Sequence, residues 1–584
     1  MMNRIISIAL ALCLLLSMTA CTGVSRDDRS EYTPTQEPSS SPNVSETEPA
    51  DDTNGEEEDR YLKVFDPPII YTTVLAPPAG DVLPEGQTIE DNLRSRMFTR
   101  QTGLKPKVIW SASGEAFTEK MNMTIASGDI PDYFQVNYQQ FEALVKADLL
   151  ADLTDAYNQI AHPDIKAIYE SADNADIKAV SKGGRIYGIP KADGLGNMNP
   201  VLWVRKDWID KLDAEEPKCI ADIAKLAEAF MKGDPDGNNV DDTDGLLIMP
   251  NYDSANPGIG SVSDIFTNYG ATPNQWRVQE DGKVIYGSLM PQAVEALELL
   301  NGWYEQGLIP KDFASWKEET YKQKVTSGQA GLLFGMWWLS WSYMTDTVIN
   351  DPSAEWTAYA LPKESEGNYI GGAPNPASSN IGVVSKEYKD PSVFIYALNN
   401  TYNAMQQPGY GAEMEEAAVV SNNYTPMTIF PLSANAIFDC SVLAYRYANG
   451  EITRDQVVEL TPDLSQKEYN LMIADCAKVV ADAESSYDHM DDWSNSMGYT
   501  IGMMAMYNAN VEFVRSDYSG ITPTMERRKT FLDKLELDAY TKMIMGDTGG
   551  KSIQEYFDEF VAQYLDQGGQ DITNEVQEVV NALR

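Results

Sequence analysis

The sequence predicts an α/β fold, because short apolar runs of strand length alternate with segments of helical periodicity. Residues 108–110 (Val-Ile-Trp) and 133–136 (Tyr-Phe-Gln-Val) have the composition of buried strands. Between them Phe117, Met121 and Ile125 recur at helical spacing, which gives the order strand, helix, strand. The chain has 584 residues, of which 43% are hydrophobic, so it can form two or more domains with large cores.

Further helices are predicted where apolar residues share one helical face. These residues are Ile220, Ile223, Leu226 and Phe230, then Val294, Leu297 and Leu300, and finally Tyr556, Phe560 and Tyr564. The uncharged segment 330–344 is rich in tryptophan, but Gly and Ser interrupt it and it is shorter than the roughly 20 residues of a membrane span. It is therefore predicted to belong to the α/β body.

The N-terminus is predicted to be a signal peptide, residues 1–20. Arg4 precedes an uncharged apolar run from Ile5 to Leu16, and small residues lead to Cys21. This pattern resembles a bacterial lipobox, in which the Cys21 thiol is lipidated and becomes the first mature residue. The alternative is a secretory peptide that is cleaved without lipidation.

Residues 21–60 are predicted to be the lipidated cysteine and a disordered acidic linker. The segment consists mainly of Ser, Thr, Pro, Asp and Glu, a composition that cannot form a core. We therefore expect a globular body tethered to the membrane through its lipid anchor, on the extracellular face of a bacterial cell. The remaining thiols, Cys219, Cys440 and Cys476, allow one bridge but no disulfide framework.

The charge of the chain excludes several classes of function. Its 44 basic and 88 acidic residues give a net charge of −44, which is incompatible with an ordinary nucleic-acid binder. Long-range repulsion also disfavours a strongly anionic ligand, although a local basic pocket could still bind one. His162 and His489 are the only histidines, so catalysis, if any, would depend on carboxylates.

Several short motifs occur in a characteristic order along residues 60–584. They are Ser127–Asp132 (Ser-Gly-Asp-Ile-Pro-Asp), Tyr187–Pro190, Leu202–Trp208, Ser327–Gly331, Gly520–Met525 and a helical tail from Ile544 to Val576. In this order they resemble the extracellular solute-binding lipoproteins, family 1, that serve carbohydrate ABC importers. The tail is most similar to the large subgroup related to alginate-oligosaccharide-binding proteins.

The resemblance implies a two-lobed, periplasmic-binding-protein-like fold with discontinuous lobes and a ligand cleft between them. The implied lobes are residues 62–189 plus 367–519 and residues 190–366 plus 520–584. It also implies a monomeric, lipid-anchored binding component, not an enzyme, that captures an oligosaccharide and delivers it to ABC permease subunits. Periodicity alone supports the α/β content but does not supply this topology.

The acidic segment from Asp234 to Gly245 is a candidate calcium loop. Oxygen ligands at alternate positions can wrap around a hard cation. Asn239 stands where such loops often have Gly, and Gly245 replaces the final bidentate Glu, so another ligand would come from elsewhere. The alternative is a solvated acidic turn, whereas the resemblance to alginate-binding proteins supports structural Ca²⁺. The expected ligands are Asp234, Asp236, Asn238, Val240 and Asp242.

Sugar recognition needs an aromatic face for the apolar side of a pyranose ring and planar polar groups for paired hydroxyls. The resemblance places an aromatic residue of the cleft directly after Ser327–Gly331, and polar groups at a strand end and after the Gly-Ile-Pro motif. The expected substrate-binding residues are Asn137, Tyr138, Asp193, Trp337, Trp338 and Trp493. Trp203 and Trp208 are instead expected to pack in the core beside Arg205.

Two other classes of function remain open. A surface carbohydrate-active enzyme would need two carboxylates at a suitable separation, and 88 acidic residues do not exclude such a pair. An adhesin-like lipoprotein would also fit a tethered acidic body. Release of reducing sugars by the protein would indicate the enzyme. A function of the protein that does not depend on a neighbouring permease would indicate the adhesin.

Overall fold

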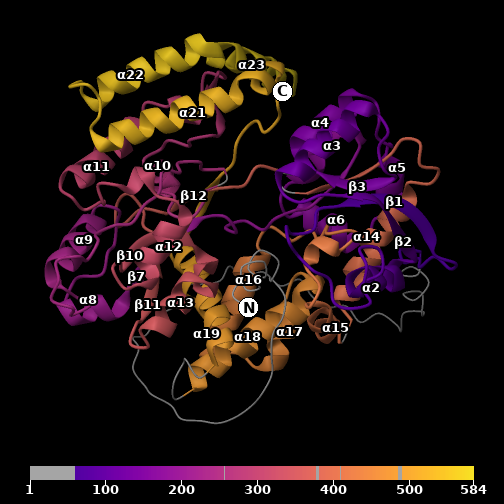
Figure 1. The fold of residues 1–584 in the computed structure, drawn as a ribbon, viewed down its shortest axis with the longest axis horizontal. Coiled ribbons are helices and arrows are strands. Elements are labelled where there is room, and N and C mark those ends of the chain that lie inside the picture. The colour runs from indigo at the N-terminus through magenta and orange to yellow at the C-terminus, as the bar shows by residue number, and fades with distance from the viewer. Residues whose placement is uncertain (1–59, 256, 377–379, 408, 484–488, 584) are drawn as a thin grey trace, which may run out of the picture.

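The computed structural model describes residues 60–255, 257–376, 380–407, 409–483 and 489–583. The predicted signal peptide, Cys21 and most of the predicted linker lie outside these ranges. The buried residues form two large clusters, which we call the smaller core and the larger core. The chain is thus a two-lobed α/β protein, as predicted, with the smaller core on the right of Figure 1 and the larger core on the left.

The smaller core is built from residues 71–192 and 381–429. Strands β1 (Ile69–Leu75) and β2 (Leu104–Ser111) pair in parallel, and β3 (Tyr133–Val136), β13 (Ile381–Val384) and β6 (Ile189–Pro190) form a second sheet in this order. The predicted order β2, α3, β3 is confirmed. The helices around these sheets are α2 (Leu93–Thr102), α3 (Glu115–Ser127), α4 (Tyr138–Lys146), α5 (Thr154–Ile160), α6 (Pro163–Glu170), α7 (Ala175–Ala179) and α14 (Ser392–Met405).

The larger core surrounds an antiparallel sheet of β10 (Leu332–Met336), β7 (Pro200–Arg205) and β11 (Trp356–Tyr359). All six residues of the central strand β7 are buried, which explains its continuous apolar run. The helices predicted from periodicity near Ile223 and Leu297 are present. The surrounding elements are α8 (Lys206–Leu212), α9 (Asp222–Gly233), α10 (Ser263–Asn268), α11 (Ala293–Glu305), α12 (Glu318–Thr326), α13 (Tyr343–Asn350), β8 (Trp276–Val278) and β9 (Val284–Tyr286).

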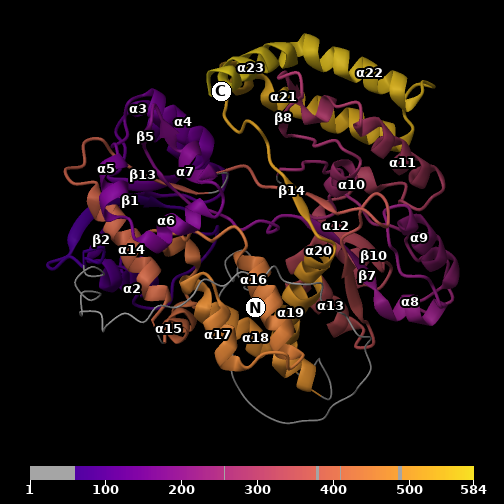
Figure 2. The same ribbon diagram turned by 180° about the vertical axis from the view of Figure 1, so that it is seen from behind.

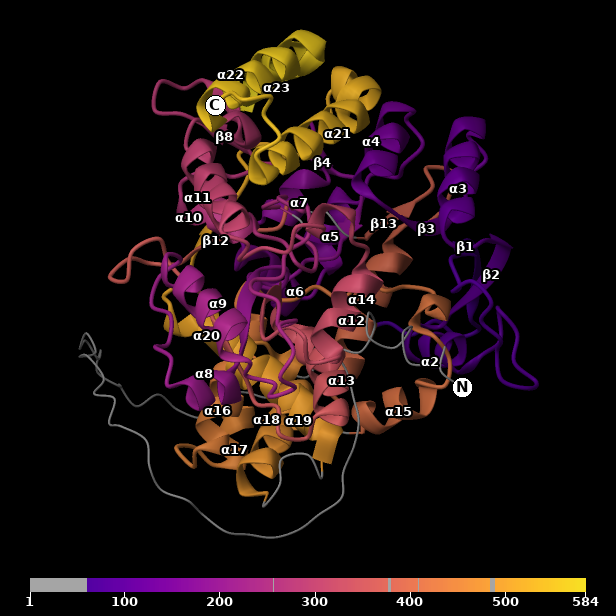
Figure 3. The ribbon, with the colours of Figure 1, turned by 60° about the vertical axis from the view of Figure 1, so that its left-hand side comes forward.

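Three C-terminal helices lie along one end of the larger core, at the top of Figure 3. They are α21 (Pro523–Met545), α22 (Ile553–Tyr564), which was predicted, and α23 (Gln570–Leu583). Helix α21 begins at a Thr522 capping box with Pro523 in its first turn, and ends at Gly546 in the left-handed conformation. None of the helices in the described ranges is long and apolar enough to cross a membrane.

A further group of helices lies at the bottom of Figure 3. It comprises α16 (Ala436–Ala448), α17 (Arg454–Leu460), α18 (Lys467–Asp482), α19 (Met490–Met497) and α20 (Met504–Asn508). The buried residues of these helices belong to the larger core. The packing is close there, because a Cβ at Gly502 would lie 2.6 Å from the Trp337 carbonyl. The lobe boundaries, residues 62–189 plus 367–519 and residues 190–366 plus 520–584, remain predictions.

In the part of the chain that the structure describes, three connections run between the two cores. The first crossing joins Ala192 to Val201, the second joins Tyr369 to Ile381, and the third joins Ile429 to Ile437. At the second crossing, strand β12 (Ile370–Gly372) pairs in parallel with β14 (Glu512–Val514), which lies in the middle of the molecule in Figure 2.

Candidate functional site

A pocket lies where the three crossings meet. The empty space within it is about 370 Å³, a volume that includes open solvent. Both cores contribute to its wall. The lining residues are Ala172, Ala175, Asp176, Lys191, Asp193, Leu195, Pro374, Asn375, Pro376, Ala434 and Arg515.

Backbone hydrogen bonds hold the crossings side by side around this pocket. The Leu195 N–H donates to the Ala434 carbonyl at 2.7 Å, which joins the first crossing to the third. The Lys191 N–H donates to the Asn380 carbonyl at 2.8 Å, which joins the start of the first crossing to the end of the second. Segments about 190 and 240 residues apart in the chain therefore build one site.

The charged groups of the pocket differ in how fully they are paired. Lys191 Nζ forms an ion pair with Asp193 Oδ1 at 2.9 Å. The guanidinium of Arg515 donates one hydrogen bond, at 3.3 Å, to the Ala172 carbonyl, and within the described ranges it forms no ion pair with a carboxylate. Asn375 Oδ1 is buried and accepts no hydrogen bond from a described residue. The pocket therefore offers unused donors and an unused acceptor, as a polyhydroxylated ligand requires.

Of the six expected substrate-binding residues, Asp193 lines this pocket. Asn137 and Tyr138 lie at the start of α4, where Asn137 Oδ1 accepts the Gln140 N–H at 2.9 Å as a helix cap. Burial, and then the neighbouring Glu142, raise the pKa of Tyr138, and Lys182 Nζ lies 3.5 Å from its hydroxyl. Tyr138 also interacts electrostatically with Tyr518, which follows β14.

The tryptophans expected at the site lie mainly in the larger core. Trp337 is fully buried and donates through Nε1 to the Asn197 carbonyl at 3.1 Å, and Trp493 is 4% exposed. Trp338 is half-buried and stacks on Trp341, with ring centroids 6.4 Å apart. None of these rings lines the pocket. Their role as sugar contacts stays a prediction.

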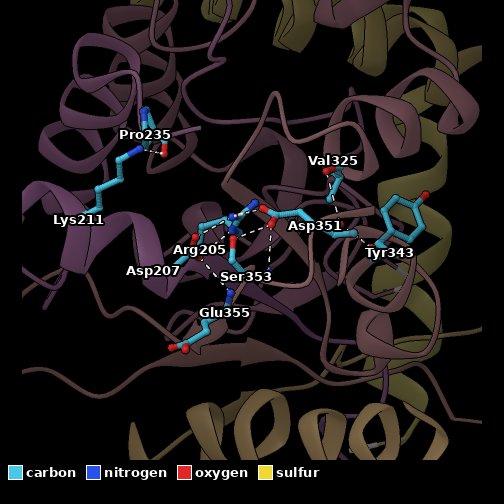
Figure 4. Close-up of polar contacts among 10 residues, drawn as sticks. Arg205, Asp207, Lys211, Pro235, Val325, Tyr343, Asp351, Ser353 and Glu355 are labelled. Carbon is cyan, nitrogen blue, oxygen red and sulfur yellow. Dashed lines mark hydrogen bonds and ion pairs between the residues drawn. The ribbon is translucent and has the colours of Figure 1, made fainter. Parts of the chain in front are cut away.

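The predicted core position of Trp203 and Trp208 beside Arg205 is confirmed. Both indoles are buried, and the Arg205 guanidinium carbon lies 4.8 Å from the centre of the Trp208 ring. Arg205 forms ion pairs with Asp207 at 2.6 Å and Asp351 at 2.9 Å, as Figure 4 shows. Burial acts to raise the pKa of Asp351, but hydrogen bonds from Ser353 and the charge of Arg205 outweigh it and leave the pKa lowered.

The acidic loop follows α9 directly, and Lys211 of α8 holds its first turn by donating to the Pro235 carbonyl at 2.6 Å (Figure 4). Asn239 adopts a left-handed conformation with φ 60°. It therefore takes the backbone conformation for which calcium loops often use Gly at this position. The Asn238 amide donates to Asp236 at 2.8 Å and to Asp242 at 3.0 Å. These three candidate ligands therefore converge on one point.

The donor set of this loop fits a hard cation in part. Asp234 Oδ1 is buried without a hydrogen-bond partner among the described residues, and burial raises the pKa of Asp236, with a further rise from Asp234 and Asp242. Repulsion among these carboxylates is what a bound cation would relieve. In the conformation described, however, no three acidic, histidine or cysteine side chains form a metal-binding group.

Sequence reasoning missed four polar residues of the pocket: Asp176, Lys191, Asn375 and Arg515. None belongs to a motif with a chemical signature. The only available signal was that Lys191 and Asp193 flank the end of the Gly-Ile-Pro segment, and that Arg515 lies shortly before Gly520–Met525. Only the meeting of the crossings brings them together.

Two lobes joined by three crossings, with a polar pocket at the junction, define the class of two-lobed solute-binding proteins. The profile of the bacterial extracellular solute-binding proteins matches residues 94–403, more than half of the chain. The chain belongs to this family, which consists of binding proteins and not of enzymes.

The curated relatives agree with this family. The chain is 29% identical over 240 residues to lipoprotein LipO of Bacillus subtilis, covering 41% of this chain and 45% of the relative. It is 28% identical over 262 residues to the fructooligosaccharide ABC transporter substrate-binding protein FusA of Streptococcus pneumoniae, covering 42% and 46%. The aligned part thus spans about half the length of each relative.

Solved structures confirm the fold. Alginate-binding protein AlgQ2, crystallised without calcium ion, matches with a TM-score of 0.55 and 16% identity over 88% of this chain and 99% of AlgQ2. An EF-hand mutant of FusA in complex with fructo-nystose matches with a TM-score of 0.53 and 16% identity over the same shares. At this level of identity the likeness shows the fold alone.

Proposed function

We propose that the protein is the substrate-binding component of an ABC importer, which captures an oligosaccharide outside the cell and delivers it to the permease. The observation that carries the proposal is the pocket at the junction of the three crossings, because a ligand held there contacts both lobes. Such a ligand stabilises the closed arrangement in preference to the open one.

Two observations support an oligosaccharide as the ligand. The pocket has unused hydrogen-bonding groups on Arg515 and Asn375, which suit hydroxyl groups. FusA, a relative, is described as a fructooligosaccharide-binding component of an ABC transporter. The proposal extends to the predicted binding residues Asn137, Tyr138, Asp193, Trp337, Trp338 and Trp493, and to a monomeric state.

A thermal-shift screen over plant, host and microbial oligosaccharides tests the proposal. A ligand at 100 times its Kd adds about 2.7 kcal/mol to the free energy of unfolding. Asp193→Asn should reduce the shift, whereas Asp281→Asn, in an exposed turn, should keep it. Absence of any shift over the whole screen would contradict a sugar receptor, and release of reducing sugars would indicate an enzyme.

We further propose that Cys21 carries the lipid anchor on the extracellular face of the membrane. The apolar run that ends at Cys21 supports this, as does the name of the relative, lipoprotein LipO. Cys21→Ser should release the protein from the membrane fraction or leave it uncleaved. Mass spectrometry that finds an unmodified mature N-terminus would contradict lipidation.

We also propose that the loop from Asp234 to Asp242 binds structural Ca²⁺. Asp234, Asp236, Asn238 and Asp242 would supply side-chain oxygens and Val240 its carbonyl, and the cation would offset their repulsion. The structures of AlgQ2 without calcium ion and of an EF-hand mutant of FusA, both of this fold, support the proposal.

Chelation tests the calcium proposal. A chelator should lower the melting temperature of the wild type, and the double variant Asp234→Ala with Asp236→Ala should lose this response. Asp281→Asn should respond like the wild type. If the wild type shows neither calcium binding by calorimetry nor a response to the chelator, the loop is an acidic turn and not a calcium site.

A further inference from the structure

The first crossing has residues of two kinds in alternation. Those of one kind line the pocket, and they are Lys191, Asp193 and Leu195. The residues that follow each of them are small and buried, and they are Ala192, Gly194 and Gly196. This alternation has the period of two that extended backbone imposes, so a rotation of the segment would turn the first set away from the pocket.

The buried side of the crossing packs closely on two helices. One is α16, and the other is the π-helix η8 (Gly498–Met503), which joins α19 to α20. A Cβ at Gly196 would lie 2.9 Å from the Phe438 ring of α16 and 3.5 Å from Met503 Sδ of η8. Gly196 also has a φ of 77°, which favours glycine. The lack of a side chain at this position therefore lets the crossing approach both helices.

Trp337 makes the side-chain hydrogen bond that holds this segment. Its Nε1 donates to the Asn197 carbonyl at 3.1 Å. The Asn197 N–H donates to the Gly194 carbonyl at 3.4 Å, and the Asn199 N–H donates to the Gly196 carbonyl at 3.2 Å. The segment that Trp337 holds is thus a turn with its own backbone bonds, and it leads directly to the residues that line the pocket.

The π-helix η8 fixes the direction of the indole N–H. A Cβ at Gly502 would lie 2.6 Å from the Trp337 carbonyl, and a Cβ at Gly498 would lie 3.5 Å from the Trp337 ring. The Tyr499 ring packs on the indole edge to face, with centroids 4.7 Å apart. Trp337 is 0% exposed, so it has no room to turn. Such π-helical turns occur often at functional sites, and this one holds a tryptophan against the crossing.

We infer that Trp337 is a positioning residue of the ligand pocket. Its indole N–H holds the Asn197 carbonyl, and this bond keeps the pocket-lining side chains of the first crossing in place. Trp337 acts through the crossing and needs no contact with the ligand. The effect on affinity rests on the proposed function of the pocket, whereas the effect on the crossing does not.

Hydrogen exchange in the ligand-free, full-length protein tests the effect on the crossing. Trp337→Phe keeps an aromatic ring and removes the N–H donor. The amides of residues 191–199, several of them hydrogen-bonded in the wild type, should exchange about two- to tenfold faster in this variant, as expected for one neutral hydrogen bond. The amides of α9 serve as an internal reference, because a general loss of stability would accelerate their exchange as well.

A second variant removes the donor without changing the shape of the side chain. In 3-benzothienylalanine a sulfur atom replaces the indole N–H, so its incorporation at position 337 should leave the packing on η8 intact. It should accelerate exchange of residues 191–199 as Trp337→Phe does. This variant decides the test if Trp337→Phe does not fold.

Trp203→Phe is the matched control. Trp203 is equally buried, and its Nε1 donates to the Met336 carbonyl at 3.0 Å, within the sheet of the larger core and not at the crossing. Exchange of residues 191–199 should therefore stay as in the wild type. Equal acceleration in the Trp203 and Trp337 variants would overturn the inference, as would unchanged exchange in the benzothienylalanine variant.

Calorimetry with the oligosaccharide selected by the thermal-shift screen tests the effect on binding. Both Trp337 variants should lose about two- to tenfold in affinity, and Trp203→Phe should bind as the wild type does. Unchanged affinity together with faster exchange would overturn the positioning role. If the wild type binds no sugar of the screen, the proposed function fails, and the exchange data still decide whether Trp337 holds the crossing.

Discussion

The Arg205 cluster and the pocket at the crossings each contain an arginine, but the two guanidinium groups use very different numbers of their hydrogen-bond donors. Arg205 forms a two-point ion pair with Asp207, at 2.7 and 2.6 Å, a further ion pair with Asp351, and a contact with the Trp208 ring. Arg515 donates one hydrogen bond, to the Ala172 carbonyl. The first arginine uses its donors within the protein, and the second keeps most of them available.

This difference separates a structural group from a binding group. Buried polar groups in folded proteins are almost always satisfied, so a saturated cluster such as that of Arg205 stabilises the fold. A polar group that remains unsatisfied in a pocket gains partners only when a ligand arrives. Loss of Arg205 should therefore affect stability, and loss of Arg515 should affect binding.

The largest effect is expected for Arg205→Met. Removal of the buried guanidinium leaves Asp207 and Asp351, which are 23% and 41% exposed, without their partner and removes the contact with the Trp208 ring, which together should cost up to about 5 kcal/mol. Denaturant unfolding measures this loss. The matched control is Lys206→Met, which removes a partly exposed pair with Asp210 and should cost less than about 1 kcal/mol. If both variants lose the same free energy of unfolding, the full set of ion pairs around Arg205 contributes no more to stability than an exposed ion pair.

Trp337 and Trp338 are neighbours in the chain but differ in burial. Trp337→Ala should cost about 3–5 kcal/mol of stability, because the side chain is fully buried. Trp338 is half-buried, so its replacement should cost less and leave a folded protein. If either ring also stacks on sugar, the folded variant should lose about 1–3 kcal/mol of binding free energy. Melting curves and calorimetry on both variants separate these effects, and equal stability losses would contradict the assignment of Trp337 to the core.

Local patterns in the sequence predicted local structure well. Periodicity gave the strand, helix, strand order at the start of the chain and the helices α9, α11 and α22, because a buried face repeats at fixed spacing. Trp203 and Trp208 are buried as predicted, Trp203 in the continuous apolar run of β7 and Trp208 in α8. The left-handed Asn239 followed from the conformational tolerance of that residue type.

The pocket could not be predicted in the same way. Lys191, Asn375 and Arg515 meet because the first two crossings and the segment after β14 lie side by side, and no spacing in the sequence encodes that contact. Trp337 and Trp338 are adjacent in a short 3₁₀ helix, where periodicity does not indicate which ring is buried. The packing of α16 to α20 on the larger core likewise depends on contacts such as that of Gly502 with Trp337.

Glu536 offers a test of a buried group that is only partly satisfied. Its Oε1 accepts hydrogen bonds from Ser288 and Asn274, at 2.8 and 3.1 Å, whereas Oε2 has no partner among the described residues. Burial raises the pKa of Glu536 from 4.5 to about 8, against a lowering by Ser288. The folded protein therefore keeps this proton to a higher pH than the unfolded chain.

The sign of the pH dependence follows from this difference. Between about pH 4.5 and pH 8 the folded state binds more protons, so the free energy of unfolding should fall as pH rises through this window and then level off. Glu536→Gln should remove this contribution, a change of a few kcal/mol across the window. Denaturant unfolding at several pH values measures it, with the exposed Glu295→Gln as control. A variant with the same slope as the wild type would show that Glu536 is ionised in the folded protein.

The smallest effect on stability, and the most selective one, is expected for Arg515→Ala. Among the described residues the side chain gives up one hydrogen bond of 3.3 Å and no ion pair, so the melting temperature should change little. Loss of charge-assisted bonds to a ligand should instead weaken binding by about 1.5–3 kcal/mol, or at least tenfold. Calorimetry with any sugar found by the thermal-shift screen measures this change. If the variant binds that sugar as tightly as the wild type, the free donors of Arg515 face solvent and not the ligand. Arg515 would then not be a binding group, and its free donors would not distinguish it from Arg205.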